Sequence, residues 1–228
     1  MALLGKAAIA MWWDMAPDWR TEFEDWHSHE HFPERMGIPG FQRGSRWADA
    51  GGGEGFFVLY ELDRYETLVS DGYLGRLNQP TPWSSRLMPE HRNMVRSQCQ
   101  VLESAGSALG GHMLTLRCSP ASGRAQPLRA YLRDQAQACA MRPGTTGAHL
   151  LQTQTPDIAA TTEQKIRGGD RAADWIYLVC GYDRQALVAA LDSALAPAAL
   201  QAHGAQALDY ARVFTLRHSA ESAGRQPT

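Results

Sequence analysis

The sequence of 228 residues lacks several patterns that identify common classes of protein. It contains no long basic run and its formal net charge is −2, so nucleic-acid binding is not indicated. It has neither a GxGxxG motif nor a P-loop, and nucleotide cofactors are therefore not expected. No CxxC pair occurs, so we expect the cysteines to be reduced and buried rather than to form a disulfide framework. They are Cys99, Cys118, Cys139 and Cys180.

Long hydrophobic runs are also missing. The apolar segment AAIAMWW (7–13), between Lys6 and Asp14, is too short to span a membrane. It resembles a strand more than a signal peptide, and we therefore expect no membrane contact and a cytoplasmic location. The chain can bury a substantial core, because its 44% of apolar and 20% of charged residues are ordinary for a globular protein.

Apolar periodicity and turn signals predict two halves with the same order of elements. In the first half, strands are expected at 6–13, 40–48, 55–62 and 91–102, with helices from Asp18 to near His31 and from 65 to 77. In the second half, strands are expected at 112–118, 147–154, 174–182 and 208–218, with helices that begin near Pro127 and after Asp183. Each half then has the β-α-β-β-α-β order of a ferredoxin-like unit.

The predicted fold class is α+β, with ferredoxin-like halves at 1–105 and 110–218 and a disordered tail at 219–228. The halves are unequal, since six of the seven tryptophans lie in the first. The first half also contains a long irregular stretch, NQPTPWSSRLMPEH (78–91). Such a loop either carries function or covers a sheet edge. We expect any site to lie in the first half and the second half to act as scaffold.

Residues 23–41, FEDWHSHEHFPERMGIPGF, combine three histidines and four carboxylates with a tryptophan. Such groups are costly to bury unless they find partners or face a cavity. On a helix with about 100° per residue, Glu30 shares the apolar arc of Trp26, while His27 and His31 lie on one flank. His31 and Glu30 are therefore either cavity-facing groups, with histidine as acid or base, or a network that stabilises the helix end.

The run from this helix into the following strand resembles the EthD-like proteins of the dimeric α/β-barrel superfamily. The matching residues are Trp26, Glu30, His31, Pro33, Pro39, Gly40, Phe41, Arg43, Arg46 and Trp47. In the second half the resemblance rests on element order alone. It implies a barrel that two chains usually close, and that a tandem chain closes alone as an internal pseudo-dimer, with or without a further homodimer. It also implies a cavity between sheet and helices for a small, often aromatic, molecule.

Two classes of function are open at this point. In the first, the protein is a cofactor-free isomerase, cyclase or lyase acting on an aromatic or polyketide-like compound, in which His31 moves a proton and Glu30 or His27 orients it. In the second, it is a binding or stress-associated barrel without activity, and Glu30 and His31 are structural. The residues expected to contact the small molecule are Trp13, Trp26, Arg46, Trp47, Tyr60 and Trp83.

His27, Glu30 and His31 also match the H-x-x-E-H motif of one class of zinc proteases. The two histidines would share a helix flank, as a metal site requires. However, Pro33 cuts the expected helix directly after the motif, and no third ligand is evident. Haem is bound by distant relatives of the resembled fold, but no local feature singles out an axial histidine. We therefore predict neither a metal nor a cofactor.

Overall fold

The strands form one closed antiparallel barrel in a computed structural model that describes residues 3–106 and 108–222. Each strand pairs with two neighbours, and every pairing is antiparallel. In order around the barrel the strands are β1 (Ala7–Asp14), β3 (Gly55–Leu62), β2 (Phe41–Asp49), β8 (Ala205–Glu221), β5 (His112–Pro120), β7 (Trp175–Gly181), β6 (Thr145–Thr153) and β4 (Arg92–Gly106).

Each half of the chain contributes four adjacent strands to this barrel. The first half has the order β4-β1-β3-β2, and the second half has the equivalent order β8-β5-β7-β6. The pairs β2–β8 and β4–β6 join the two sheets at their edges. The α+β class and the ferredoxin-like order expected from the sequence are thereby confirmed, and one chain closes the barrel by itself.

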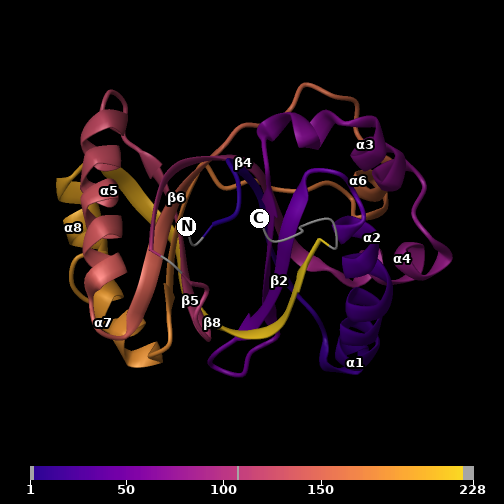
Figure 1. Ribbon diagram of the computed structural model, residues 1–228, viewed down its shortest axis with the longest axis horizontal. Helices are drawn as coiled ribbons and strands as arrows, with labels where there is room; N and C mark the ends of the chain where they lie inside the picture. Colours follow the sequence, from indigo (N-terminus) through magenta and orange to yellow (C-terminus); the bar gives the residue numbers. More distant parts are fainter. Residues whose placement is uncertain (1–2, 107, 223–228) are drawn as a thin grey trace, which may run out of the picture.

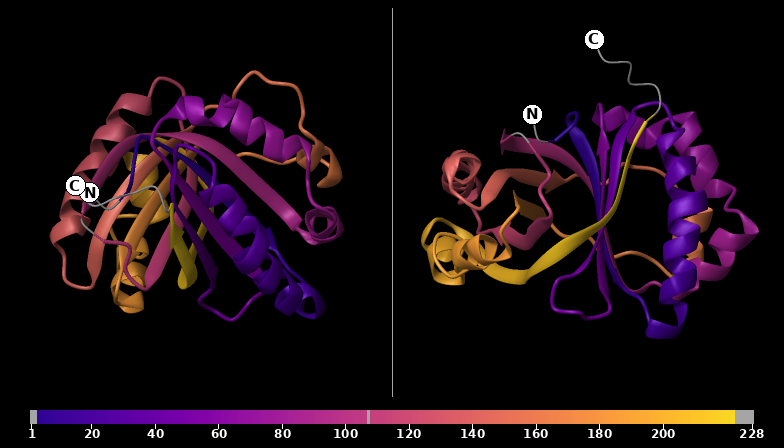
Figure 2. Two further views of the ribbon diagram at one scale, coloured as in Figure 1. Left: turned by 45° about the vertical axis from the view of Figure 1, so that its right-hand side comes forward. Right: turned by 60° about the horizontal axis from the view of Figure 1, so that its bottom comes forward.

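Helices cover the outer faces of the two sheets at opposite ends of the molecule (Figure 1 and Figure 2). The second sheet carries α5 (Ala125–Met141), α7 (Arg184–Leu191) and α8 (Pro197–Ala202). The first sheet carries α1 (Pro17–Trp26), α2 (Phe32–Met36), α3 (Asp71–Asn78), α4 (Pro82–Leu87) and the short 3-10 turns η2 (Tyr65–Val69) and η3 (Met88–Glu90). The helix α6 (Thr162–Ile166) belongs to the second half in sequence, yet it packs against α3 beside the first sheet (Figure 1).

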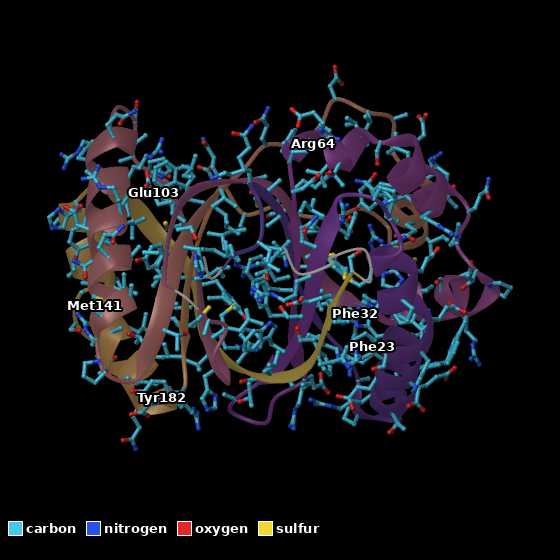
Figure 3. The ribbon with its side chains drawn as sticks, in the orientation of Figure 1. Phe23, Phe32, Arg64, Glu103, Met141 and Tyr182 are labelled. Carbon is cyan, nitrogen blue, oxygen red and sulfur yellow. The ribbon has the colours of Figure 1, made fainter. Side chains whose placement is uncertain are left out.

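The core has three layers because each strand buries both of its faces. Along β1, Trp12 packs inside the barrel, while the next residue, Trp13, packs outward against the helices of the first half. All eight residues of β3 are buried for the same reason. Figure 3 shows Phe23 and Phe32 between the first sheet and the helices α1 and α2, and both side chains are fully buried. The helices α1 and α2 thus cover a large layer of aromatic side chains on the outer face of the first sheet.

The helix before β2 begins and ends at different residues from those expected. It starts at Pro17, with Ala16 rather than Asp18 at the N-cap. It does not stop near His31, because the chain passes through a π-helical turn at His27–His31 and continues as α2 to Met36. Pro33 occupies an early position of α2, where a helix tolerates a residue without an N–H group. The expectation that Pro33 ends the helix is therefore wrong, because proline is compatible with the first turn of a helical segment.

Two further expectations need correction. The irregular stretch 78–91 contains a regular part, α4, followed by η3. Residues 219–221 belong to β8 and pair with β2, so the expected tail does not begin at 219, and residues 223–228 lie outside the described residues. Within the described parts of the chain, no helix is both long and apolar enough to cross a membrane.

Candidate functional site

A narrow pocket lies between the outer face of the first sheet and the helices that cover it. Its cavity volume is about 40 Å³, with further open space at its mouth. The sheet contributes Ile9, Met11, Trp13, Tyr60, Met94 and Arg96. The covering segments contribute Trp26, His27, His31, Arg35, Tyr73, Leu77, Met88, His91, Glu163 and Arg167. We refer to this set as the helix-side pocket. Most of its wall is apolar, with a few polar groups that converge, which is typical of small-molecule sites.

The π-helical turn places two histidines together in this pocket. The rings of His27 and His31 stack with their centroids 5.4 Å apart, and the indole of Trp26 lies 4.5 Å from the ring of His31. Burial holds the pKa of both histidines well below its ordinary value, and the positive charges of Arg35 near His31 and Arg46 near His27 lower it further. Both rings are therefore neutral at pH 7. Single π turns within helices are frequent at functional sites.

A third histidine, His91, faces the same pocket from the position between η3 and β4. Its Nδ1 lies 3.0 Å from the carbonyl oxygen of Leu87 and 3.2 Å from that of Met88. Because carbonyl oxygens only accept hydrogen bonds, Nδ1 carries the hydrogen and Nε2 keeps its lone pair. Burial lowers the pKa of His91 to about 4, so this ring is neutral as well. The pocket thus contains three uncharged imidazoles.

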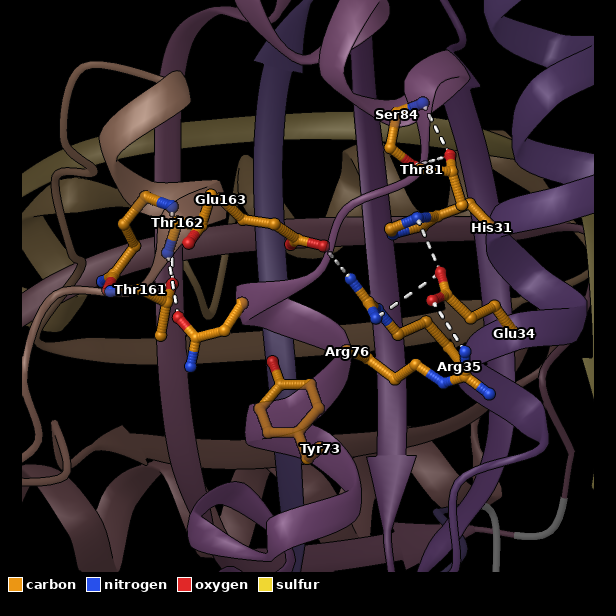
Figure 4. Close-up of polar contacts among 12 residues, drawn as sticks. His31, Glu34, Arg35, Tyr73, Arg76, Thr81, Ser84, Thr161, Thr162 and Glu163 are labelled. Carbon is orange, nitrogen blue, oxygen red and sulfur yellow. Dashed lines mark hydrogen bonds and ion pairs between the residues drawn. The ribbon is translucent and has the colours of Figure 1, made fainter.

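Cationic groups of the pocket come from both halves of the chain. Figure 4 shows the guanidinium group of Arg35, on α2, in an ion pair with Glu163 on α6, and both side chains are about 95% buried. Arg167 lies 3.4 Å from the same carboxylate and 2.8 Å from Asp170. Arg96 donates to the hydroxyl of Tyr73 at 2.7 Å. Glu163, Asp170 and Glu34 balance much of the charge of Arg35 and Arg167. Arg96 is bonded to a neutral hydroxyl instead, and its positive charge favours an anionic ligand or an anion formed in the pocket.

Several buried polar atoms in the pocket have no hydrogen-bond partner in the protein. They are Nε1 of Trp13, Nδ1 of His27, Nδ1 of His31, Nη1 of Arg35 and the hydroxyl of Tyr60. Glu34 lies near two of them, with its carboxylate 3.9 Å from Nδ1 of His31 and 3.7 Å from Nη1 of Arg35. Unpaired buried polar groups are rare in native proteins. Their convergence on one pocket indicates a place where a ligand or ordered water completes the hydrogen bonding.

The pocket includes five of the residues expected from the sequence and excludes four. Trp13, Trp26, His27, His31 and Tyr60 line it. Trp47 lies on the opposite face of β2, fully buried inside the barrel. Trp83, on α4, is half-buried and donates to the carboxylate of Glu22 at 3.1 Å. Arg46 is buried beside α1, where it donates to the carbonyl oxygen of Glu24 at 3.1 Å.

Glu30 is the clearest correction among the candidate catalytic residues. It is half-buried rather than buried, and its Oε1 accepts from Nε1 of Trp26 at 3.1 Å and from the hydroxyl of Thr81 at 2.5 Å. Ser84 Oγ is a third neighbour at 3.4 Å. Among the residues that the structure describes, no basic side chain pairs with it. Glu30 does lie on the side of Trp26, as the helical angle predicted, but its carboxylate is bonded to residues at the start of α4 and not to a basic partner.

The sequence interpretation missed the groups that give the pocket its charge. Glu163 and Arg167 come from the connection between β6 and β7, so the second half supplies part of the site and is not only a scaffold. Arg35 of the first half pairs with this Glu163 rather than with an acid of its own half. One signal in the sequence was available, since the connection between β6 and β7 (154–174) is longer than the stretch at 78–91 and is also mainly irregular.

The H-x-x-E-H match does not form a converging set. His27 and His31 face the pocket, whereas Glu30 is bonded to α4. Among the residues that the structure describes, no group of three or more His, Cys, Asp or Glu side chains is arranged to hold a metal ion.

Comparison with known proteins identifies the fold. No family model matches the sequence, and no curated protein is significantly similar to it. An anthrone oxidase-like protein of known structure superposes with a TM-score of 0.64 at 12% identity, covering 96% of this chain and 94% of its own. A proposed monooxygenase from Fusobacterium nucleatum gives 0.62 at 7% identity, with 97% of each chain covered.

A third structure is an uncharacterized ferredoxin-fold protein from Listeria monocytogenes, related to antibiotic biosynthesis monooxygenases. It gives a TM-score of 0.50 at 6% identity and covers 95% of this chain and 97% of its own. The chain has the ferredoxin-like dimeric α/β-barrel fold. At such low identities the likeness concerns the fold alone, and function has to be argued from the pocket.

Proposed function

We propose that this barrel protein binds a small, weakly acidic aromatic molecule in the helix-side pocket and moves a proton between that molecule and a neutral histidine. The observation that carries the proposal is the convergence of three neutral imidazoles and three arginines on one mainly apolar pocket. An apolar wall selects a flat hydrophobic ligand, and the polar groups orient its oxygen atoms.

The chemistry follows from the charges. A neutral imidazole accepts a proton, and a ligand that loses a proton from carbon or from a phenol becomes an enolate or phenolate. The guanidinium groups of Arg35 and Arg96 stabilise that anion by charge. The anion in turn favours the protonated form of the nearby histidine, which raises its pKa toward neutrality when the ligand is bound. His31 is the first candidate for this transfer, because its Nδ1 is unpaired and Glu34 lies 3.9 Å away to stabilise the imidazolium.

His91 is the second candidate, because its Nε2 lone pair is left available by the two carbonyl groups that hold Nδ1. His27 stacks on His31 and restricts the orientation of that ring. Glu30 has no part in this scheme, since it does not line the pocket. All the steps use side chains of this chain. The reaction class supported by proton transfer is isomerisation, cyclisation or elimination.

The description of one fold neighbour suggests a compound with which to probe the pocket. This neighbour is described as anthrone oxidase-like, and an anthrone is a polycyclic aromatic ketone with an acidic carbon. The equivalent strand order of the two halves supports an origin by tandem duplication, with the chain as its own pseudo-dimer. The EthD-like resemblance at residues 26–47 and a cytoplasmic location remain parts of the proposal, and the buried thiols of Cys99, Cys139 and Cys180 support the latter.

A second candidate function is binding without turnover. It is favoured by the narrowness of the pocket, in which the indoles of Trp13 and Trp26 occupy part of the wall. In that case the histidines only bind the ligand, and the protein acts as a carrier or sensor of an aromatic compound.

The test begins with binding and continues with turnover. Purified protein is screened by thermal shift against anthrone, hydroxylated naphthalenes and simple phenols, and each compound that stabilises it is then followed by absorbance and mass spectrometry. We expect His31→Gln to keep the melting temperature within a few degrees and to lower turnover by about 10²–10⁴-fold, the usual loss of general acid–base catalysis. His91→Gln shows which of the two rings transfers the proton.

The matched control is His203→Gln, since this exposed histidine stacks on Tyr131 at the opposite end of the molecule. It should change neither binding nor turnover. If no compound shifts the melting temperature, the proposed ligand class is wrong. If a compound is converted and neither His31→Gln nor His91→Gln affects the conversion, the proton-transfer proposal fails. If a compound binds and is not converted, the carrier function is supported instead.

A further inference from the structure

The helix-side pocket in its present shape is too small for the aromatic molecule proposed above. Its cavity volume of about 40 Å³ has room for roughly three water molecules, since each water needs about 10–15 Å³. An engineered apolar cavity that admits benzene measures about 150 Å³. Part of the wall therefore has to move before such a ligand can enter.

The wall segment that comes from the second half is a loop whose two ends are fixed close together on β4. At its start, the N–H of Gln154 donates to the carbonyl oxygen of Gln98 at 2.8 Å. At its end, the N–H of Arg96 donates to the carbonyl oxygen of Arg171 at 2.8 Å. We refer to residues 155–170, which lie between these two bonds, as the crossing flap. Compact surface loops with adjacent ends are frequently functional.

Both arms of the crossing flap are loosely held. Residues 155–160 form no helix or strand and are mostly exposed. On the other arm, Gly168 and Gly169 are exposed and adopt φ values of 79° and 98°, which favour glycine. A Cβ atom added at either glycine would meet nothing within 4 Å beyond its chain neighbours, so close packing does not restrain this arm. Such positions can absorb the backbone rotation of a hinge.

The helix α6, at the tip of the crossing flap, closes the pocket between two elements of the first half. It contacts α3, which carries Leu77, and η3, which carries Met88, and both of these side chains line the pocket. In Figure 1 the loop that carries α6 passes from the second half to the side of α3. Movement of α6 away from α3 and η3 would therefore widen the pocket without changing the pairing of the barrel strands.

Polar contacts of α6 with the first half lie in its first turn. Figure 4 shows the carboxylate of Glu163 directed at the guanidinium group of Arg35, with which it forms the ion pair. The N–H of Thr162 donates to Oδ1 of Asn78 at 3.1 Å. Further along α6, Ile166 packs against the apolar core of the first half. These contacts hold the tip of the flap closed.

The charges of the crossing flap are arranged so that it can open. Arg167 pairs with Glu163 and Asp170, and all three residues belong to the flap and move together. When the flap opens, Arg35 and Glu163 both reach water, and the solvation of the two charges offsets their lost attraction. Opening therefore differs from removing one partner, which leaves the other charge buried.

We propose that the crossing flap is a lid, supplied by the second half, that opens to admit the ligand to the helix-side pocket and closes over it. The ion pair between Arg35 and Glu163 keeps the lid closed. A closed lid excludes water from the neutral histidines and strengthens the charge interactions of a bound anion. The proposal rests on the proposed function for the nature of the ligand, whereas opening itself is measured without any ligand.

The experiment measures opening of the lid in the full chain by thiol labelling. Met88→Cys places a thiol in the pocket wall beside α6, and its rate of reaction with dithiodipyridine is compared with that of Leu132→Cys. Leu132 lies in the core of the second half and is fully buried, so a thiol there reacts through global unfolding. The native cysteines are buried, and the wild type gives their background. We expect position 88 to react at least about tenfold faster than position 132.

Glu163→Gln, combined with Met88→Cys, removes the charge that keeps the lid closed and preserves the size of the side chain. It should raise the labelling rate by about tenfold or more, as loss of a charged hydrogen bond implies. The matched control is Glu103→Gln, which removes the partner of Arg129 at 2.6 Å in the second half and should leave the rate unchanged. Equal effects of the two substitutions, or labelling at position 88 no faster than at position 132, overturn the proposal.

Hydrogen exchange of the wild type tests the lid without any substitution. The amides of α6 should exchange faster than those of α3 and β7, and equal protection of α6 and β7 would overturn the proposal. A compound that binds in the thermal-shift screen should slow the labelling at position 88, because it favours the closed lid, and an unchanged rate would refute closure. Opening that is observed when no aromatic compound binds supports the lid and refutes only the proposed ligand class.

Discussion

The ion pair between Arg35 and Glu163 connects α2 of the first half to α6 of the second, and removing one partner should be strongly destabilising. Both side chains are about 95% buried. Burial opposes the charge of Arg35, but Glu163 together with the nearby Tyr73, Glu34 and Tyr60 outweighs this effect, and the pKa of Arg35 rises above its ordinary value. In Glu163→Ala the guanidinium keeps Glu34, at 3.7 Å, as its one acidic neighbour among the residues that the structure describes. A buried charge left without its partner typically costs about 3–5 kcal/mol of the free energy of unfolding.

The assay is equilibrium denaturation in guanidinium chloride, monitored by tryptophan fluorescence. Replacing both charges with apolar groups of similar size, Arg35→Met with Glu163→Leu, should restore most of the lost stability, because neither charge then remains buried. The matched control is Glu54→Ala, which removes one partner of the exposed ion pair with Arg92 and should cost at most about 1 kcal/mol. A change below about 0.5 kcal/mol for Glu163→Ala, the range of ordinary surface sites, would refute this account of the pair.

Two further outcomes follow from the site. The pKa values of His27, His31 and His91 lie below 6.5 in the folded protein, so below pH 6.5 the unfolded chain binds more protons. Stability should therefore be fully retained above pH 6.5 and fall as the pH drops toward 4, by at most about 1.4 kcal/mol per pH unit for each ring. Melting temperatures between pH 4 and 7 should show this slope, and His31→Gln should flatten it; an equal slope in both proteins would contradict the assignment. Glu30→Ala should cost only about 1–3 kcal/mol through lost hydrogen bonds and leave ligand binding intact, so a loss of binding would place Glu30 in the pocket after all.

Local pattern was sufficient for most of the strands. GFFVLYEL (55–62) was expected as a strand at the residues where β3 occurs, because a continuous apolar run between turn residues has few other stable conformations. Asp183 was expected to cap a helix, and its side chain accepts from the N–H of Gln185 at the start of α7. The repeated order of elements indicated two ferredoxin-like halves. Because the sheet of each half has edge strands that need partners, the two halves were expected to pair with each other.

Tertiary structure alone decided which side chains meet in the pocket. Arg35 and Glu163 are 128 residues apart, and no local pattern relates them. Trp47 was placed in the pocket by composition and lies inside the barrel, because a strand sends successive residues to opposite faces and only the closed barrel defines which face is inner. The π turn at His27–His31 is another feature that the sequence pattern did not predict, and it affects a single turn of helix. The sequence determined by itself that a histidine-rich helix end would lie against the first sheet. Packing determined which of its groups face the sheet, because one extra residue in a turn rotates every side chain that follows.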